Sequence, residues 1–254
     1  MNTFDPSSEY PIVFLNSVPK SGTHLMKQIL EGIPGMTQNP YEFYEGYPED
    51  SGLHYQRLQL VRSGHFTAGH VYYSPRWSGM LRELKIKPLF LNRDLRDIVI
   101  SYTYFITDKY PNHPLRPYLL SLPDRNQQFL ALIQGIPELH YPSIAAWYGQ
   151  FAGWSGEADC LQIAFEHLVD SHSSRRRTME QLIRYLWADK PLPLPMHTIL
   201  DAMEQNINPK ASYTFRTGTT GNWRTEFNEE VKTCFKEVAG HLLFPAGYET
   251  DYNW

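Results

Sequence analysis

The sequence has little cysteine, no long hydrophobic run and no excess of positive charge. Its 254 residues include two cysteines, Cys160 and Cys234, which show neither a disulfide framework nor metal-ligand spacing and fit a reducing compartment. No apolar run approaches the ~20 residues of a membrane-spanning helix, and the N-terminus lacks the basic and apolar regions of a signal peptide. A net charge of −4 argues against a nucleic-acid partner. We therefore expect an unprocessed, cytoplasmic chain without membrane insertion.

The chain alternates strand-like and helix-like segments, and no repeat or linker divides it. The strand–helix pairs are 11–18 with 24–33, 87–93 with 95–107, and 160–165 with 176–188. This alternation predicts an α/β fold, a single domain over residues 1–254 with a central parallel sheet flanked by helices. The Pro- and Tyr-rich regions 39–64 and 108–146 are predicted to be long loops or loop-and-helix insertions.

A lysine, a glycine and two hydroxyl residues meet at the first strand-to-helix junction. Backbone N–H groups and the helix dipole attract an anion at such a junction. Gly22 allows close backbone approach, Ser21 and Thr23 add hydroxyl donors, and Lys20 adds a full positive charge. The alternative is a plain turn with a capping serine and an exposed lysine. The coincidence of all four residues favours a P-loop-like phosphate-binding loop.

The position of the lysine excludes the most familiar phosphate loop. P-loop kinases carry Gly-x4-Gly-Lys-[Ser/Thr], whereas Lys20 precedes Gly22 and no glycine occurs in residues 1–19. The order Pro-Lys-Ser-Gly-Thr after an apolar strand resembles the phosphosulfate-binding loop of the cytosolic-type sulfotransferases, in their short, bacterial-like form. That resemblance implies 3′-phosphoadenosine 5′-phosphosulfate (PAPS) as co-substrate, with no metal.

Two later segments resemble motifs of the same family. In the first, Arg93 ends a predicted strand and Ser101 follows eight residues later on a helix. An arginine offers a forked, permanent charge suited to phosphate, and the resemblance implies that both residues bind the 3′-phosphate. On the alternative interpretation, Arg93 forms a surface ion pair with Asp94 or Asp97.

The second segment runs from Phe215 to Phe227 and resembles a loop that closes over the 3′-phosphate. The resemblance makes Arg216 a direct ligand and lets Gly218 contribute through its backbone. Thr217 stands where the family usually has lysine, and Asn222 where it has aspartate. The lost lysine is expected to weaken affinity for the nucleotide without removing the main charge contact.

Residues implied by resemblance near the adenine and the phosphosulfate are weaker matches. Phe165 takes the place of an adenine-side tyrosine, Thr198 lies in a segment near the base, and Leu25 replaces a stacking tryptophan. His24 lies beside the phosphate loop, where a hydrogen-bonding or capping role and a catalytic role are both open.

Sulfuryl transfer needs a cation at the leaving group and a base for the acceptor proton. We assign the first role to Lys20. The family's catalytic histidine follows the first helix at the end of a short strand, and His70 occupies that place, with only the histidine of Lys-Thr-His retained in Ala68-Gly69-His70. His65 and a purely structural histidine are the alternatives.

The acceptor is expected to be a small molecule with a hydroxyl or amine, of unknown identity, and the oligomeric state is likewise unknown. Aromatic residues that could line its pocket are Tyr41, Phe43, Tyr44, Tyr47, Tyr72, Tyr73, Tyr104 and Tyr141. An acidic cluster, Glu42, Glu45, Glu49 and Asp50, suits either a cationic or polyhydroxylated acceptor or a solvated loop. The rival functions are a P-loop-type nucleoside or small-molecule kinase and a catalytically silent nucleotide-binding protein.

Overall fold

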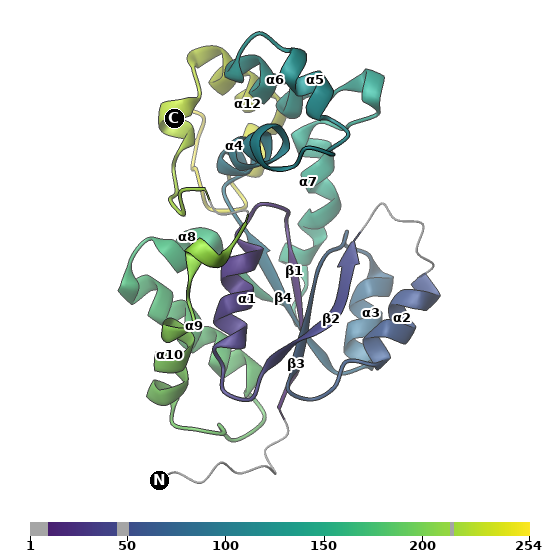
Figure 1. Ribbon diagram of the computed structural model, residues 1–254, viewed down its shortest axis with the longest axis vertical. Helices are drawn as coiled ribbons and strands as arrows, with labels where there is room; N and C mark the ends of the chain where they lie inside the picture. The colour runs from purple at the N-terminus through teal and green to yellow at the C-terminus, as the bar shows by residue number, and fades with distance from the viewer. Residues whose placement is uncertain (1–9, 45–50, 214–215) are drawn as a thin grey trace. The chain divides into compact units, whose positions relative to one another are not determined.

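The computed structural model describes residues 10–44, 51–213 and 216–254. They form two compact units, shown in Figure 1. The first contains the chain up to Asn92 together with Phe151–Tyr213, and the second contains Arg93–Gln150 and Thr214–Trp254. The single domain over 1–254 stays a prediction.

The first unit contains a five-stranded sheet in the order β2-β3-β1-β4-β5. Its strands are β1 (Ile12–Ser17), β2 (Thr37–Tyr44), β3 (His65–His70), β4 (Ile86–Asn92) and β5 (Leu161–Ala164). All neighbouring strands pair in parallel, which confirms the predicted α/β class. Along the chain, β2 and β3 are added on one side of β1, and β4 and β5 are then added on its other side. In open α/β sheets, such a reversal opens a ligand crevice at the carboxyl ends of the strands.

Helices cover both faces of this sheet (Figure 1). One side carries α1 (Thr23–Glu31), α8 (Phe165–Val169), α9 (His172–Leu186) and α10 (Met196–Gln205); the other carries α2 (Ser51–Gln59) and α3 (Pro75–Glu83). Val13 and Leu15 of β1 belong to the core under the first group. Phe14, between them, stacks on Trp77 of α3 with ring centroids 5.4 Å apart. Burial on both faces explains why β1 is almost continuously apolar.

The described part of the second unit is helical. It contains α4 (Leu95–Tyr104), the π-helical turn η1 (Phe105–Lys109), α5 (Arg116–Ser121), α6 (Arg125–Gln134), η2 (Pro137–Leu139), α11 (Trp223–Glu226), α12 (Glu229–Ala239) and η5 (Gly240–Leu242). The helix α7 (Ile144–Ala152) leads back into the first unit, which also holds the short turns η3 (Gly153–Gly156) and η4 (Pro209–Ala211). Among the described residues, no helix is both long and apolar enough to cross a membrane.

Two element predictions need correction. Residues 37–44, placed largely in a loop region, form the edge strand β2. Pro40 obscured it, because proline is tolerated only at edges and irregularities of a sheet, and the register of β2 shifts between Gln38 and Glu42. The helix predicted over 95–107 ends as an α-helix at Tyr104 and continues as the π-helical turn. The region 108–146 is loop-and-helix, as predicted.

Candidate functional site

The phosphate loop lies between β1 and α1, at the carboxyl end of the central strand. Two of its residues have left-handed backbone, Lys20 with φ 73° and Gly22 with φ 98°. Gly22 is also the N-cap of α1 and makes no side-chain cap. A Cβ at Gly22 would lie 2.8 Å from Cε2 of Phe165 and closer still to Cδ2. Glycine is therefore required here by conformation and by space.

The hydroxyl of Ser21 is turned inward. It is fully buried and donates to the carbonyl oxygens of Val18, at 2.5 Å, and Leu91, at 3.1 Å. Ser21 therefore holds the loop onto β4, and direct contact with an anion stays a prediction for it. Thr23 Oγ1 instead lies 2.8 Å from Oγ of Ser17.

His70 is joined to the same network. Its Nδ1 lies 2.7 Å from the carbonyl oxygen of Ser17 and 3.2 Å from the Ser17 hydroxyl. Because a carbonyl only accepts, Nδ1 carries the proton and Nε2 keeps its lone pair. Burial lowers the pKa of His70 to about 4, and the positive charges of Lys27 and Lys20 act in the same direction. The imidazole is therefore neutral at pH 7.

A second group of charges lies close to His70. The ammonium of Lys27 pairs with Glu42, which also accepts from Gln38 and from the phenol of Tyr44. The ring of Tyr44 lies 5.6 Å from that of His70, centroid to centroid. Glu42 is thus a paired carboxylate rather than an open acidic surface, and Glu45, Glu49, Asp50 and Tyr47 lie outside the described residues.

The histidine of the loop, His24, is the second residue of α1 and has an exposed side chain. Its pKa is lowered by desolvation and by the charges of Lys27 and Lys20. A neutral imidazole at a helix N-terminus can donate one hydrogen bond to an anion.

The three residues expected on the adenine side have different environments. Phe165 is buried against Gly22, Leu25 is half-buried against the core, and Thr198 is exposed near the start of α10. Phe43, one of the aromatics considered for an acceptor pocket, is fully buried and packs on Phe14 and Trp77 as a core residue.

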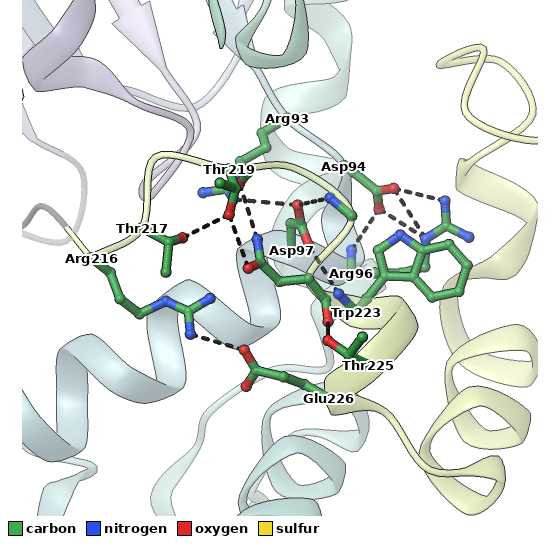
Figure 2. Close-up of polar contacts among 12 residues, drawn as sticks. Arg93, Asp94, Arg96, Asp97, Arg216, Thr217, Thr219, Trp223, Thr225 and Glu226 are labelled. Atoms are coloured by element: carbon green, nitrogen blue, oxygen red, sulfur yellow. Dashed lines mark hydrogen bonds and ion pairs between the residues drawn. The ribbon is translucent and has the colours of Figure 1, made fainter. Parts of the chain in front are cut away.

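In the second unit, Arg93 and the segment 216–226 meet around Asp97 (Figure 2). Nη2 of Arg93 lies 3.3 Å from Oδ2 of Asp97 and donates to the carbonyl of Thr219 at 3.0 Å. The alternative interpretation named Asp97 as an ion-pair partner of Arg93, and this pair exists. It does not lie at the surface, because the side chains of Arg93 and Asp97 are only 9% and 0% exposed.

The other residues predicted to bind the 3′-phosphate also belong to the second unit. Nη1 of Arg216 pairs with Glu226 at 2.9 Å, and its guanidinium lies 4.5 Å from the ring centre of Tyr104. Ser101 is half-buried on α4, and Thr217 and Gly218 are exposed, Gly218 with φ 66°. Phe215 lies outside the described residues.

Sequence reasoning missed three residues that organise these two groups, Ser17, Asn16 and Glu226, and considered a fourth, Asp97, only as a surface partner of Arg93. Ser17 links the loop to His70, and Asn16 holds the chain after His70 by exchanging two 2.9 Å hydrogen bonds with the backbone of Val71. Asp97 and Glu226 pair with the two arginines. The signal for the first two was an Asn-Ser pair ending an otherwise apolar strand.

Comparison with known proteins gives relatives and a fold, while no family model matches the chain. It is 26% identical over 173 residues to sulfotransferase 1E1 of Rattus norvegicus and 25% identical over 174 residues to that of Mus musculus. Each match covers 61% of this chain and 54% of the relative, so the chain spans about half the length of the curated relatives it matches.

Solved structures match over nearly the whole chain. Mouse sulfotransferase SULT7A1 complexed with PAP aligns with a TM-score of 0.64 at 18% identity, covering 92% of this chain and 84% of that one. The chain has the sulfotransferase fold. Retinol dehydratase in a complex with retinol and PAP aligns with a TM-score of 0.60 at 14% identity, covering 95% and 84%. The resemblance inferred from three sequence motifs is confirmed by these relatives.

Proposed function

We propose that this protein is a sulfotransferase that moves a sulfuryl group from PAPS to a hydroxyl or amine of a small-molecule acceptor. The observation that carries the proposal is the junction after β1. There, a lysine loop with left-handed backbone at Lys20 and Gly22 is connected through Thr23 and Ser17 to a neutral histidine, His70. A phosphate-binding loop coupled to a base suits transfer of an anionic group to a protic acceptor.

Each unit, taken by itself, carries residues of a kind that binds phosphate groups. In the first unit, the loop presents the N-terminus of α1 and the Lys20 ammonium, as a 5′-phosphosulfate requires. In the second, Arg93 and Arg216 offer two guanidinium groups, and Ser101 offers a hydroxyl on α4. We assign the 3′-phosphate to these three residues and to the backbone at Gly218, and the adenine side to Phe165, Thr198 and Leu25.

The chemical step is an in-line displacement. The acceptor oxygen or nitrogen attacks sulfur, and the bond from sulfur to the 5′-phosphate oxygen breaks, leaving its electron pair on 3′-phosphoadenosine 5′-phosphate (PAP). Lys20 stabilises that oxygen by its charge. Nε2 of His70 takes the acceptor proton, because Nδ1 already donates to Ser17. We also propose a cytoplasmic location and no nucleic-acid partner.

The test is calorimetric titration of the purified protein with PAP and, in parallel, with ATP and magnesium. We expect PAP to bind tightly, ATP–magnesium weakly, and Arg93→Ala to weaken PAP strongly. Arg184→Ala is the matched control, because Arg184 forms an exposed pair with Glu180 in the first unit. Binding of ATP–magnesium without PAP would instead indicate the kinase, and binding of neither would contradict both the sulfotransferase and the kinase.

Turnover then separates an enzyme from a nucleotide-binding protein. With radiolabelled PAPS and a panel of phenols, alcohols and amines, we expect label in a product and its loss in His70→Ala and Lys20→Ala. A chain that binds PAP yet labels no acceptor in a broad panel would argue for the silent protein.

A further inference from the structure

One carboxylate fastens the loop Arg216–Trp223 to the start of α4 (Figure 2). Oδ2 of Asp97 accepts the backbone N–H of Gly221 at 2.8 Å, and Oδ1 accepts that of Trp223 at 3.2 Å. Both N–H groups belong to a turn with Gly221 at φ 73°. Charge-assisted bonds of this kind are about twice as strong as neutral ones, so Asp97 determines where the loop lies.

The same carboxylate also orients an arginine. Nη2 of Arg93 reaches Oδ2 of Asp97 at 3.3 Å and the carbonyl of Thr219, within the loop, at 3.0 Å. Thr219 is in turn bonded to Asn222, whose amide donates to the Thr219 carbonyl at 3.0 Å. Arg93 and the loop therefore share one support, and a displacement of Asp97 would move both.

Asp97 itself does not suit a role as nucleotide ligand. Its side chain is fully buried, and each of its oxygens already accepts from a protein donor. A carboxylate would also repel a phosphate. It can act on a bound phosphate only through the groups that it holds.

We propose that Asp97 is a positioning residue of the 3′-phosphate site, which sets Arg93 and the loop 216–223 in a common geometry for that phosphate. This inference rests on the proposed function. It assigns to Asp97 an effect confined to ligands that carry a 3′-phosphate, whereas a merely structural carboxylate would alter all ligands alike.

The experiment compares PAP with AMP, which lacks the 3′-phosphate, as ligands of wild-type protein and of Asp97→Asn. Asparagine keeps the shape but loses the charge and one acceptor. We expect the affinity for PAP to fall about 10- to 100-fold, as metal affinity does when a residue that orients a metal ligand is lost, with AMP unchanged. Hydrogen exchange at the amides of Gly221 and Trp223 should accelerate in the ligand-free variant.

Two further variants test whether a loss of PAP affinity could come from general destabilisation or from misfolding. Leu119→Ala removes a fully buried side chain of α5 in the same unit and should lower stability without changing the PAP-to-AMP affinity ratio. Asp97→Glu keeps the charge and serves if Asp97→Asn does not fold. It should lower the same ratio to a smaller extent.

The outcomes separate this inference from the proposed function. Wild-type protein that fails to bind PAP overturns the proposed function, and the inference with it. Wild-type protein that binds PAP, with Asp97→Asn showing an unchanged PAP-to-AMP ratio, overturns the inference alone. Equal losses for PAP and AMP would make Asp97 a general support of the fold.

Discussion

The ring of Phe165 occupies the space that a side chain on Gly22 would need, so the first residue of α8 packs directly on the phosphate loop. This contact joins β5 and its following helix to the loop after β1. It places an aromatic residue that sequence resemblance linked to adenine against the backbone of the loop instead of in open solvent.

Gly22→Ala is therefore expected to destabilise the folded protein for two reasons. Alanine is strained at φ 98°, and its Cβ collides with the Phe165 ring. We expect the free energy of unfolding to fall by about 1–3 kcal/mol, measured by urea denaturation. Adding Phe165→Leu should recover part of the loss by relieving the collision while leaving the backbone strain.

Gly79→Ala is the matched control, because Gly79 lies in α3 and a Cβ there meets nothing within 4 Å. It should be neutral or stabilising by up to about 1 kcal/mol. A Gly22→Ala protein as stable as Gly79→Ala would show that the loop relaxes around an added methyl group.

The low pKa of His70 predicts the pH dependence of the reaction. Burial favours the neutral imidazole, so the pKa falls to about 4 and the base is available well below the ordinary pKa of histidine. We expect kcat/KM to keep its value as pH falls through 6.5 and to decline only as pH approaches 4, where the imidazole becomes protonated. An acid limb centred near 6.5 would contradict the burial of this histidine.

Ser17→Ala tests the hydrogen-bond part of the same argument. It removes the hydroxyl between Thr23 and His70 but leaves the Ser17 carbonyl that accepts from Nδ1. We expect a drop of up to about tenfold in kcat with little change in PAP affinity, since one hydrogen bond is worth about 0.5–1.5 kcal/mol. Equal effects on kcat and on PAP affinity would assign Ser17 to the loop rather than to the base.

Nη1 of Arg216 pairs with Glu226, and this carboxylate competes with a phosphate for the guanidinium of Arg216. The two side chains are 26% and 21% exposed. A pair of this kind is worth about 0–1 kcal/mol, so Glu226→Gln should tighten PAP binding by up to about fivefold in calorimetry. Glu229→Gln, which affects an exposed pair with Lys232, is the control and should change nothing. Weaker binding by Glu226→Gln would mean that Glu226 supports the bound state.

The sequence predicted features that are formed by neighbouring residues, and it missed hydrogen bonds between residues far apart in the chain. The phosphate loop is contiguous, so Lys20, Gly22 and Thr23 could be recognised from order alone. The bonds of Asp97 to Gly221 and Trp223 join residues 124 and 126 positions apart, and a single sequence carries no sign of them. Glu226 pairs with Arg216 only 10 positions earlier in the chain, but the order of residues does not indicate which arginine a glutamate meets.

The order of residues in the sequence also did not show which side chains are buried. Ser21 has the right position for an anion donor, but its hydroxyl is buried and engaged by two carbonyls. The strand β2 was missed because its residues do not alternate regularly between buried and exposed and because it contains a proline. Its pairing with β3 stabilises the strand despite the weak strand preference of its own residues.

Arg96 contacts four residues of the second unit, two tryptophans and two carboxylates. Its guanidinium lies 3.7 Å from the ring centre of Trp223 and 4.4 Å from that of Trp254, and it pairs with Asp94 at 2.7 Å and Glu249 at 2.6 Å. Arg96→Ala should lower the free energy of unfolding by about 3–5 kcal/mol, because it leaves the buried carboxylate of Asp94 unpaired. Arg184→Ala, in an exposed pair, should cost less than about 1 kcal/mol.

The pH dependence of that loss identifies its cause. Burial already raises the pKa of Asp94, and Arg96 opposes the rise. Without Arg96 the pKa of Asp94 should rise further, so the folded variant takes up a proton that the unfolded chain still lacks. A group whose pKa is raised on folding adds stability at low pH and loses it as pH rises through the folded value. The deficit of Arg96→Ala, measured by urea unfolding, should therefore be smaller at pH 5 than at pH 8. A deficit independent of pH would assign it to the lost packing between Trp223 and Trp254.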